Sequence, residues 1–141
     1  MMRRWAGVLL LCAVYLPAAA ASPQTQFELG RAYRNGTRVP VDAARAAALI
    51  RDAAAANYAP AMFTLSNMLA EGEGTARDPI EARRWLEAAA ALDYPEALQQ
   101  LALNLKDGAA GYERDAARSA QLMRQAAHAL RHRAHEHTHE H

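Results

Sequence analysis

The chain has 141 residues but only one cysteine and few β-branched aliphatic side chains. Valine and isoleucine together number six, which leaves almost no material for β-strands and argues against a β-rich fold. The formal net charge is only +1, so the sequence lacks the basic excess that is typical of nucleic-acid-binding proteins. A chain of this length accommodates one domain. These absences together favour a single helical domain that does not bind nucleic acid.

Histidine is missing from the first 127 residues, because all six histidines lie at position 128 or later. An activated serine nucleophile needs a neighbouring general base, and histidine most often has that role. Ser66 and Ser119 also fall at positions where small residues pack between helices. We therefore predict a protein that is not an enzyme and requires no cofactor.

Alanine is what the sequence has in abundance. The hydrophobic share is 52%, but 36 of the 141 residues are alanine, which has the best helix propensity and buries little surface. The composition is therefore that of closely packed helices without a bulky central core.

Residues 1–21 have the pattern of a secretory signal peptide. Two arginines precede the uncharged, leucine-rich stretch Trp5–Leu16, and small residues then lead to the Ala19-Ala20-Ala21 site. We expect cleavage after Ala21, with Ala20 as the neighbouring alternative, and export to the periplasm or the medium. The other interpretation is a retained anchor over residues 5–21, which at 17 residues falls short of the roughly 20 that span a membrane. Cleavage removes the only cysteine, so no disulfide can form and no membrane span remains.

A period of 36 residues organises the rest of the chain. Glycines recur at 36, 72 and 108, and leucines recur at 29, 65 and 101. Asp42 and Asp78 keep the same spacing, whereas Asp115 comes one residue late, which places an insertion in the loop after Gly108. We expect three repeats, at residues 25–60, 61–96 and 97–133, within a domain of residues 22–133.

Each repeat is predicted to contain two helices, for six in total. In the second repeat Pro60 favours a helix start, and Gly72 can adopt the left-handed conformation that ends a helix. Asp78 and Glu81 then have the spacing of a capping box. Asn57 and Asp93 follow the second helices, where positive φ is expected. In the third repeat Leu130 occupies that position, so the last helix should continue into the basic tail.

Small residues align within the predicted helices. Gly30, Ser66 and Ala102 share one position of the first helices, and alanine pairs share another position in the second helices. Small side chains allow close helix approach, and we expect the larger ones to fill the gaps between helices: Leu29, Leu65, Leu101 and Trp85.

These residues carry a resemblance to a known family. The patterns Leu-Gly-x-x-Tyr-x-x-Gly at residues 29–36 and Gly-x-Gly, Asp-Pro, Ala-x-x-Trp and Ala-Ala across residues 72–90 resemble the Sel-one-like repeat (SLR), a relative of the tetratricopeptide repeat. Leu69 and Leu105 depart from the family's tyrosine, and Leu49 and Leu122 depart from its tryptophan. The resemblance implies an all-α, right-handed α-solenoid that binds proteins or peptides as an adaptor or scaffold.

In such a solenoid the first helices line the concave side. Their polar residues outside the packing register are the candidate protein-binding residues: Arg31, Arg34, Asn67, Glu71, Gln100 and Asn104. Polar rows of this kind suit hydrogen bonding and charge complementarity with a peptide. For any single member, a solvated helix face is the alternative.

Residues 134–141 form a His-rich tail in which histidines alternate with two glutamates. The candidate metal ligands are His132, His135, His137, His139 and His141, and this composition suits Zn²⁺, Ni²⁺ or Cu²⁺. His128 and His132 stand four apart on the predicted last helix, so both could face one ion. A disordered polar tail or a purification tag are the alternatives. The primary prediction is thus an exported protein–protein interaction scaffold with an unidentified partner, and the second is a periplasmic metal-binding protein.

Overall fold

The structure, a computed structural model, describes residues 21–138 and contains six α-helices and no strand in that part of the chain. The predicted signal peptide at residues 1–21 therefore falls almost entirely outside the described residues, as do His139 and His141. The helices are α1 (Pro23–Asn35), α2 (Ala43–Ala55), α3 (Ala59–Glu71), α4 (Pro79–Ala91), α5 (Pro95–Asp107) and α6 (Ala116–Thr138).

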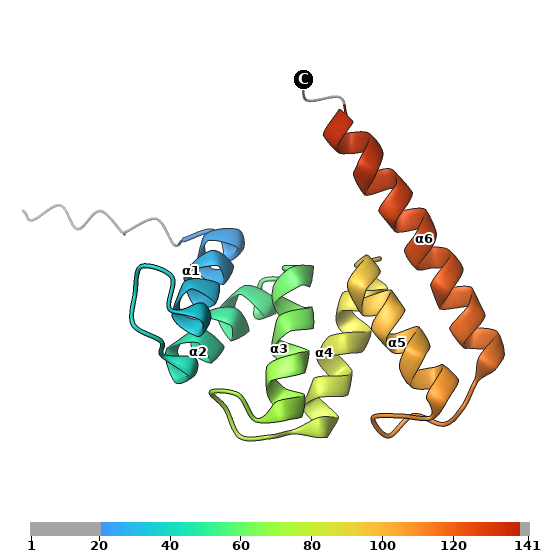
Figure 1. The fold of residues 1–141 in the computed structure, drawn as a ribbon, viewed down its shortest axis with the longest axis horizontal. Helices are drawn as coiled ribbons and strands as arrows, with labels where there is room; N and C mark the ends of the chain where they lie inside the picture. Colours follow the sequence, from blue (N-terminus) through green and yellow to red (C-terminus); the bar gives the residue numbers. More distant parts are fainter. Residues whose placement is uncertain (1–20, 139–141) are drawn as a thin grey trace, which may run out of the picture.

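The helices form three hairpins that stack side by side, α1 with α2, α3 with α4 and α5 with α6 (Figure 1). Each helix packs mainly against the helices that precede and follow it in the chain. This arrangement confirms the predicted all-α solenoid of three repeats, because each described hairpin packs only against the neighbouring hairpins. The hand of the superhelix stays a prediction from the family resemblance.

The turns between helices repeat the same backbone conformation. Gly72 ends α3 with φ of 74°, and its amide donates to the carbonyl of Met68, as predicted for a left-handed cap. The glycines one period before and after it adopt φ of 70° and 68°. Asn57 and Asp93 also have positive φ, at 64° and 56°, which confirms their predicted role after the second helices.

Aspartates cap the second helix of every repeat. The Asp78 carboxylate accepts hydrogen bonds from the amides of Ile80 and Glu81, and the amides of Arg45 and Arg118 donate in the same way to Asp42 and Asp115. The capping box predicted for Glu81 is wrong, however. Its side chain forms an ion pair with Arg51 on α2 and accepts a hydrogen bond from the Trp85 indole. A charge-assisted pair with another helix replaces the local bond to the cap.

Small residues hold the two helices of each hairpin close together. The Ser66 hydroxyl on α3 donates to the carbonyl of Ala82 on α4 at 2.7 Å, and the Ser119 hydroxyl on α6 donates to the carbonyl of Ala102 on α5 at the same distance. At the equivalent point of the first repeat, a Cβ on Gly30 would lie 2.7 Å from the Ile50 side chain. Both serines are therefore structural, since their hydroxyls are buried and already paired within a helix contact.

The prediction that Leu29 fills a gap between helices is wrong. Leu29 is 43% exposed, whereas the equivalent Leu65 and Leu101 are 0% and 2% exposed. Within the described chain no helix precedes α1, so nothing covers the face that α2 and α4 cover in the later repeats. Trp85 is only half-buried and packs against the edge of the core.

The stretched loop of the third repeat is anchored on the second repeat. Tyr112 is buried, its hydroxyl donates to Glu87 at 3.0 Å, and the Arg83 guanidinium lies 4.1 Å from the centre of its ring. Arg83 also donates to the carbonyl of Gly111 at 3.0 Å. The extra residue that shifts the third repeat therefore lies in the loop between α5 and α6, and this loop packs against the second repeat.

Helix α6 continues past Leu130 to Thr138, as the absence of a helix-breaking residue predicted (Figure 1). Residues 134–138 belong to the same helix as the end of the third repeat. The structure therefore shows no break at residue 134, where a separate tail was predicted to begin. Over these five residues the alternative of a disordered tail is wrong.

We expect Ala89→Leu to destabilise the protein by roughly 1–3 kcal/mol, because overpacking a closed core contact displaces its neighbours. Ala89 is 0% exposed on α4. The measurement is the free energy of unfolding from urea denaturation. Ala91→Leu, at an exposed position two residues later, is the matched control and should be close to neutral. Equal stability of the two variants would show that Ala89 does not limit the helix approach.

Candidate protein-binding groove

A groove of about 340 Å³ lies between the first helices of the second and third repeats, with α4 beneath it. Residues of α3, α4 and α5 and of the loops that join helices within the second and third repeats line it: Ser66, Asn67, Ala70, Glu71, Arg77, Pro79, Ala82, Arg83, Leu86, Gln100, Asn104 and Ala110. The buried Ala82 and Leu86 contribute an apolar part, whereas the α3 and α5 side chains are mainly polar. Grooves that combine these two features suit recognition of a peptide chain.

Four of the six predicted protein-binding residues line this groove, namely Asn67, Glu71, Gln100 and Asn104. They come from two helices that are consecutive first helices of the solenoid. The repeat register predicted that these side chains lie on the same side of the solenoid. The structure shows that they line one groove.

The amides of the groove differ in how strongly they are held. Asn104 is 7% exposed, and its side-chain oxygen accepts a hydrogen bond from the Gln100 amide at 3.0 Å. The Asn67 amide, on α3 at the opposite side of the same groove, has no hydrogen-bond partner among the described residues. A carboxamide both donates and accepts, so it can pair with either backbone group of an extended peptide.

Two arginines of the groove were missed by the sequence reasoning. Arg77 precedes α4 and donates to the Ala70 carbonyl at 3.0 Å, and Arg83 lies on α4 itself. The solenoid pattern places only the first helices on the concave side, whereas these residues reach the groove from a loop and a second helix. Together with Glu71 they give the groove charges of both signs.

The other two predicted residues lie elsewhere. Arg31 is exposed on α1, where it pairs with Glu28 at 3.3 Å, outside the groove. Arg34 forms a two-pronged ion pair with Glu73 of the second repeat, with N–O distances of 2.8 and 2.7 Å. Arg34 therefore joins two repeats.

Three arginine–glutamate pairs of this type connect helices or loops that are distant in the sequence: Arg34–Glu73, Arg51–Glu81 and Glu96–Arg133. Hydrogen bonds from these arginines lower the pKa of all three carboxyl groups, and the Trp85 indole lowers that of Glu81 further. Burial raises the pKa of Tyr94, whose ring contacts Arg133, and of Tyr112, whose ring contacts Arg83.

The predicted metal ligands that the structure describes are His132, His135 and His137, all on α6. In residues 21–138 no three or more histidine, cysteine or carboxylate side chains are arranged to hold a metal ion. His132 instead has His128 as its ring neighbour, with ring centres 4.4 Å apart.

The family model of the Sel1 repeat matches residues 23–58, 59–94 and 95–129. The chain belongs to the Sel1 repeat family. The matched repeats begin two residues before the predicted boundaries, and the third ends four residues earlier than expected. Sel1 repeats generally mediate protein–protein interactions, and scaffolds built from them are typically not enzymes.

Solved structures of other Sel1 repeat proteins are similar. A Sel1 repeat protein from Oxalobacter formigenes is 29% identical with a TM-score of 0.76, and the match covers 80% of this chain and 46% of that one. A protective antigen of uropathogenic Escherichia coli strains, which displays an SLR fold, is 27% identical with a TM-score of 0.69. There the match covers 75% of this chain and 22% of the antigen. The chain thus spans less than half of either relative, and no curated protein matches it.

Among the described residues, none of the helices combines the length and the apolar character needed to cross a membrane.

We expect the Sel1 repeats to lose stability in acid. The pKa of Glu73, Glu81 and Glu96 lies below the ordinary value of 4.5 in the folded state, so their ion pairs stabilise the fold above that pH. This contribution is lost as the pH falls from about 4.5 through the lower folded-state pKa. Each side chain in these pairs is 28–42% exposed, so each pair should contribute roughly 1 kcal/mol or less.

The measurement is urea denaturation of the parent and of the triple variant with Glu73, Glu81 and Glu96 changed to glutamine. The variant should be less stable than the parent near pH 7, and this difference should shrink as the pH falls below about 4.5 and the parent's three carboxylates become protonated. Glu113→Gln, at an exposed loop position, is the control and should change little at either pH. An equal deficit of the triple variant at both pH values would contradict the role of these pairs.

Proposed function

We propose that this Sel1 repeat protein is an exported interaction module that holds a segment of another protein in the groove between α3, α4 and α5. The observation that carries the proposal is the convergence of Asn67, Glu71, Gln100 and Asn104 from two helices on one groove. This convergence, together with the family, supports an adaptor or scaffold.

The groove suits a short extended segment of the partner. Its volume of about 340 Å³ is at the lower end of typical ligand pockets and holds only a few residues of a peptide. Asn67 and Gln100 can pair with the backbone of that segment, since amide side chains supply both donors and acceptors. Glu71 and Arg77 flank the amides with opposite charges, which favours a segment that itself carries both signs.

The side chains of the described residues also support a protein without catalysis. The two buried serines already donate to main-chain carbonyls, and His128, the first histidine of the chain, comes more than two helical turns after Ser119 on α6. A serine nucleophile would need a base within hydrogen-bond reach.

Export is supported by the signal-peptide pattern of residues 1–21 and by the position of the first helix. Ser22 caps α1, and its hydroxyl accepts a hydrogen bond from the Thr25 amide at 3.1 Å. Cleavage after Ala21 would therefore leave every helix and its cap intact.

The binding proposal is tested with peptides selected against the purified protein from a random peptide library. We expect the double variant with Asn67 and Gln100 changed to alanine to weaken binding by about tenfold or more, since each lost hydrogen bond costs roughly 0.5–1.5 kcal/mol. Calorimetric titration measures the affinity. Arg31→Ala, outside the groove on α1, is the matched control and should bind as the parent does. Peptides that bind the double variant with the parent's affinity would place the binding site elsewhere.

The export proposal is tested by expressing the full chain with its leader in a Gram-negative host. We expect the protein in the periplasmic fraction or the medium, with a mature N-terminus at Ser22 by mass spectrometry. Ala19→Arg and Ala21→Arg, which remove the small residues of the site, should block processing. An intact N-terminus at Met1 on the parent protein would favour the retained anchor.

A further inference from the structure

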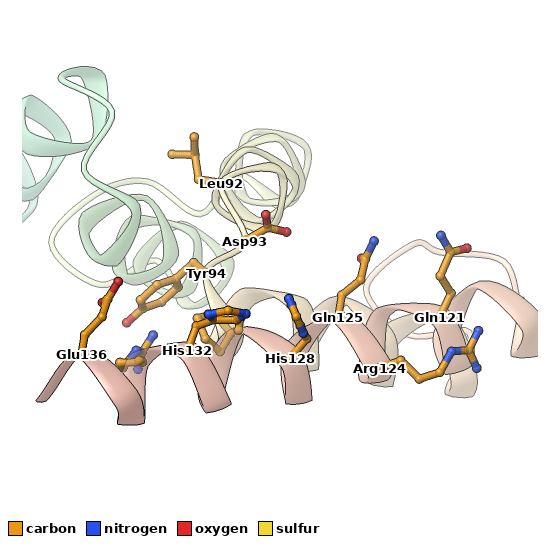
Figure 2. Close-up of a pocket in the computed structure, with 12 residues that line it drawn as sticks. Leu92, Asp93, Tyr94, Gln121, Arg124, Gln125, His128, His132 and Glu136 are labelled. Carbon is orange, nitrogen blue, oxygen red and sulfur yellow. The ribbon is translucent and has the colours of Figure 1, made fainter. Parts of the chain in front are cut away.

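A second and larger groove, of about 940 Å³, lies where α6 extends past the segment that joins α4 to α5. The segment from Leu92 to Pro95 forms one side, and residues of α6 from Gln121 to Glu136 form the other. Figure 2 shows His128 and His132 on the side of α6 that faces Leu92, Asp93 and Tyr94. This groove shares no lining residue with the protein-binding groove.

The two histidines are placed as a pair. They stand one helical turn apart, so their side chains leave α6 on the same face. Their ring centres are 4.4 Å apart, and the rings are inclined at 70°. Two histidines four residues apart on a helix are an effective chelating pair, because both imidazoles can reach one ion without bending the backbone.

Oxygen ligands are present in the same groove. Glu136 lies one turn beyond His132 on α6, and Asp93 lies across the groove in the segment between α4 and α5. Figure 2 shows Asp93 across the groove from the histidine pair and Glu136 further along α6, beyond Tyr94. Two imidazoles with one or two carboxylates form a ligand set that suits Zn²⁺.

We propose that His128 and His132 bind one divalent transition-metal ion, with Zn²⁺ as the reference ion, in the groove between α6 and the α4–α5 segment. Glu136 and Asp93 are the carboxylates that complete the site, together with water. The ion would connect the extension of α6 to the second repeat. Within residues 21–138 no three ligands are already arranged for an ion, so Asp93 or Glu136 must move toward the imidazoles when the ion binds.

The site differs from the one that the sequence predicted in the tail. His137, five residues beyond His132, leaves α6 on another face, since a helical turn takes 3.6 residues. His135 shares a face with His132 but does not line the groove. His132 is therefore common to both assignments, and His128 is the residue that separates them.

Nearby positive charges determine how tightly the ion binds. Arg133 lines the groove but forms an ion pair with Glu96 at 2.8 Å, which compensates its charge. Arg124, one turn before His128, also lines the groove and has no ion pair among the described residues. Its charge opposes a cation, so we expect Arg124→Gln to tighten metal binding.

The test uses a full-length variant in which His135, His137, His139 and His141 are all alanine, so that only His128 and His132 remain. Calorimetric titration with Zn²⁺ near pH 7.5 should give one ion per chain. Changing either His128 or His132 to alanine in this background should weaken binding by about tenfold or more, since even loss of an orienting group costs a metal site roughly 10–100-fold. Circular dichroism of the apo variants shows whether α6 remains helical.

A spacing control separates a chelating pair from histidine content alone. His132→Ala combined with Ala134→His keeps two histidines in the same background, but places them six residues apart on different faces of α6. This variant should bind as weakly as His132→Ala. Asp93→Asn and Glu136→Gln should each weaken binding less than loss of a histidine.

Two results would overturn the proposal. One is a background variant that binds no Zn²⁺, because the ion would then depend on the tail histidines. The other is a spacing control that binds as tightly as the His128–His132 pair. Neither result bears on the protein-binding groove, whose residues are unchanged in all these variants.

Discussion

Close approach between helices at small residues is the constraint on which the rest of this structure depends. The core contains many fully buried alanines, and at three equivalent points the contact is closed by Gly30, by Ser66 and by Ser119. Small side chains bring the helix backbones together but bury little apolar surface of their own. The remaining stabilisation must come from stacking hairpin on hairpin, which is why the same leucine position is buried in the second and third repeats and exposed in the first.

The contacts between repeats then determine where the functional surfaces lie. Arg34–Glu73 and Arg51–Glu81 connect the first repeat to the second, and the Tyr112 loop connects the third repeat to the second. Each contact joins charged or aromatic groups that lie at the edge of the core and in loops. The Tyr112 loop packs against α4, which lies beneath the candidate groove between α3 and α5. A Sel1 repeat protein of this size can thus present a defined groove without a bulky core or a disulfide bond.

The two grooves have different chemistry and different positions. The first is lined by amides and by charges of both signs and belongs to the middle of the solenoid. The second depends on α6 being longer than the other helices, since His132 and Glu136 lie beyond the last matched repeat residue at 129. The proposed protein binding and the proposed metal binding can therefore be tested separately by mutation. An ion at the second groove would act on the end of the solenoid and on the Asp93 turn.

The sequence by itself determined the helical class, the period, the cap at Asp78 and the continuation of α6, because these depend on local propensity and on spacing along the chain. It also identified the register of the four groove residues. The tertiary structure decided that Arg34 pairs with Glu73, that Glu81 turns to Arg51, that Tyr112 is buried and that Arg83 reaches the groove. These outcomes depend on which repeat lies beside which and at what distance. A repeat period gives the order of the helices along the chain, whereas contacts between repeats follow from the angle at which their alanine-lined faces meet.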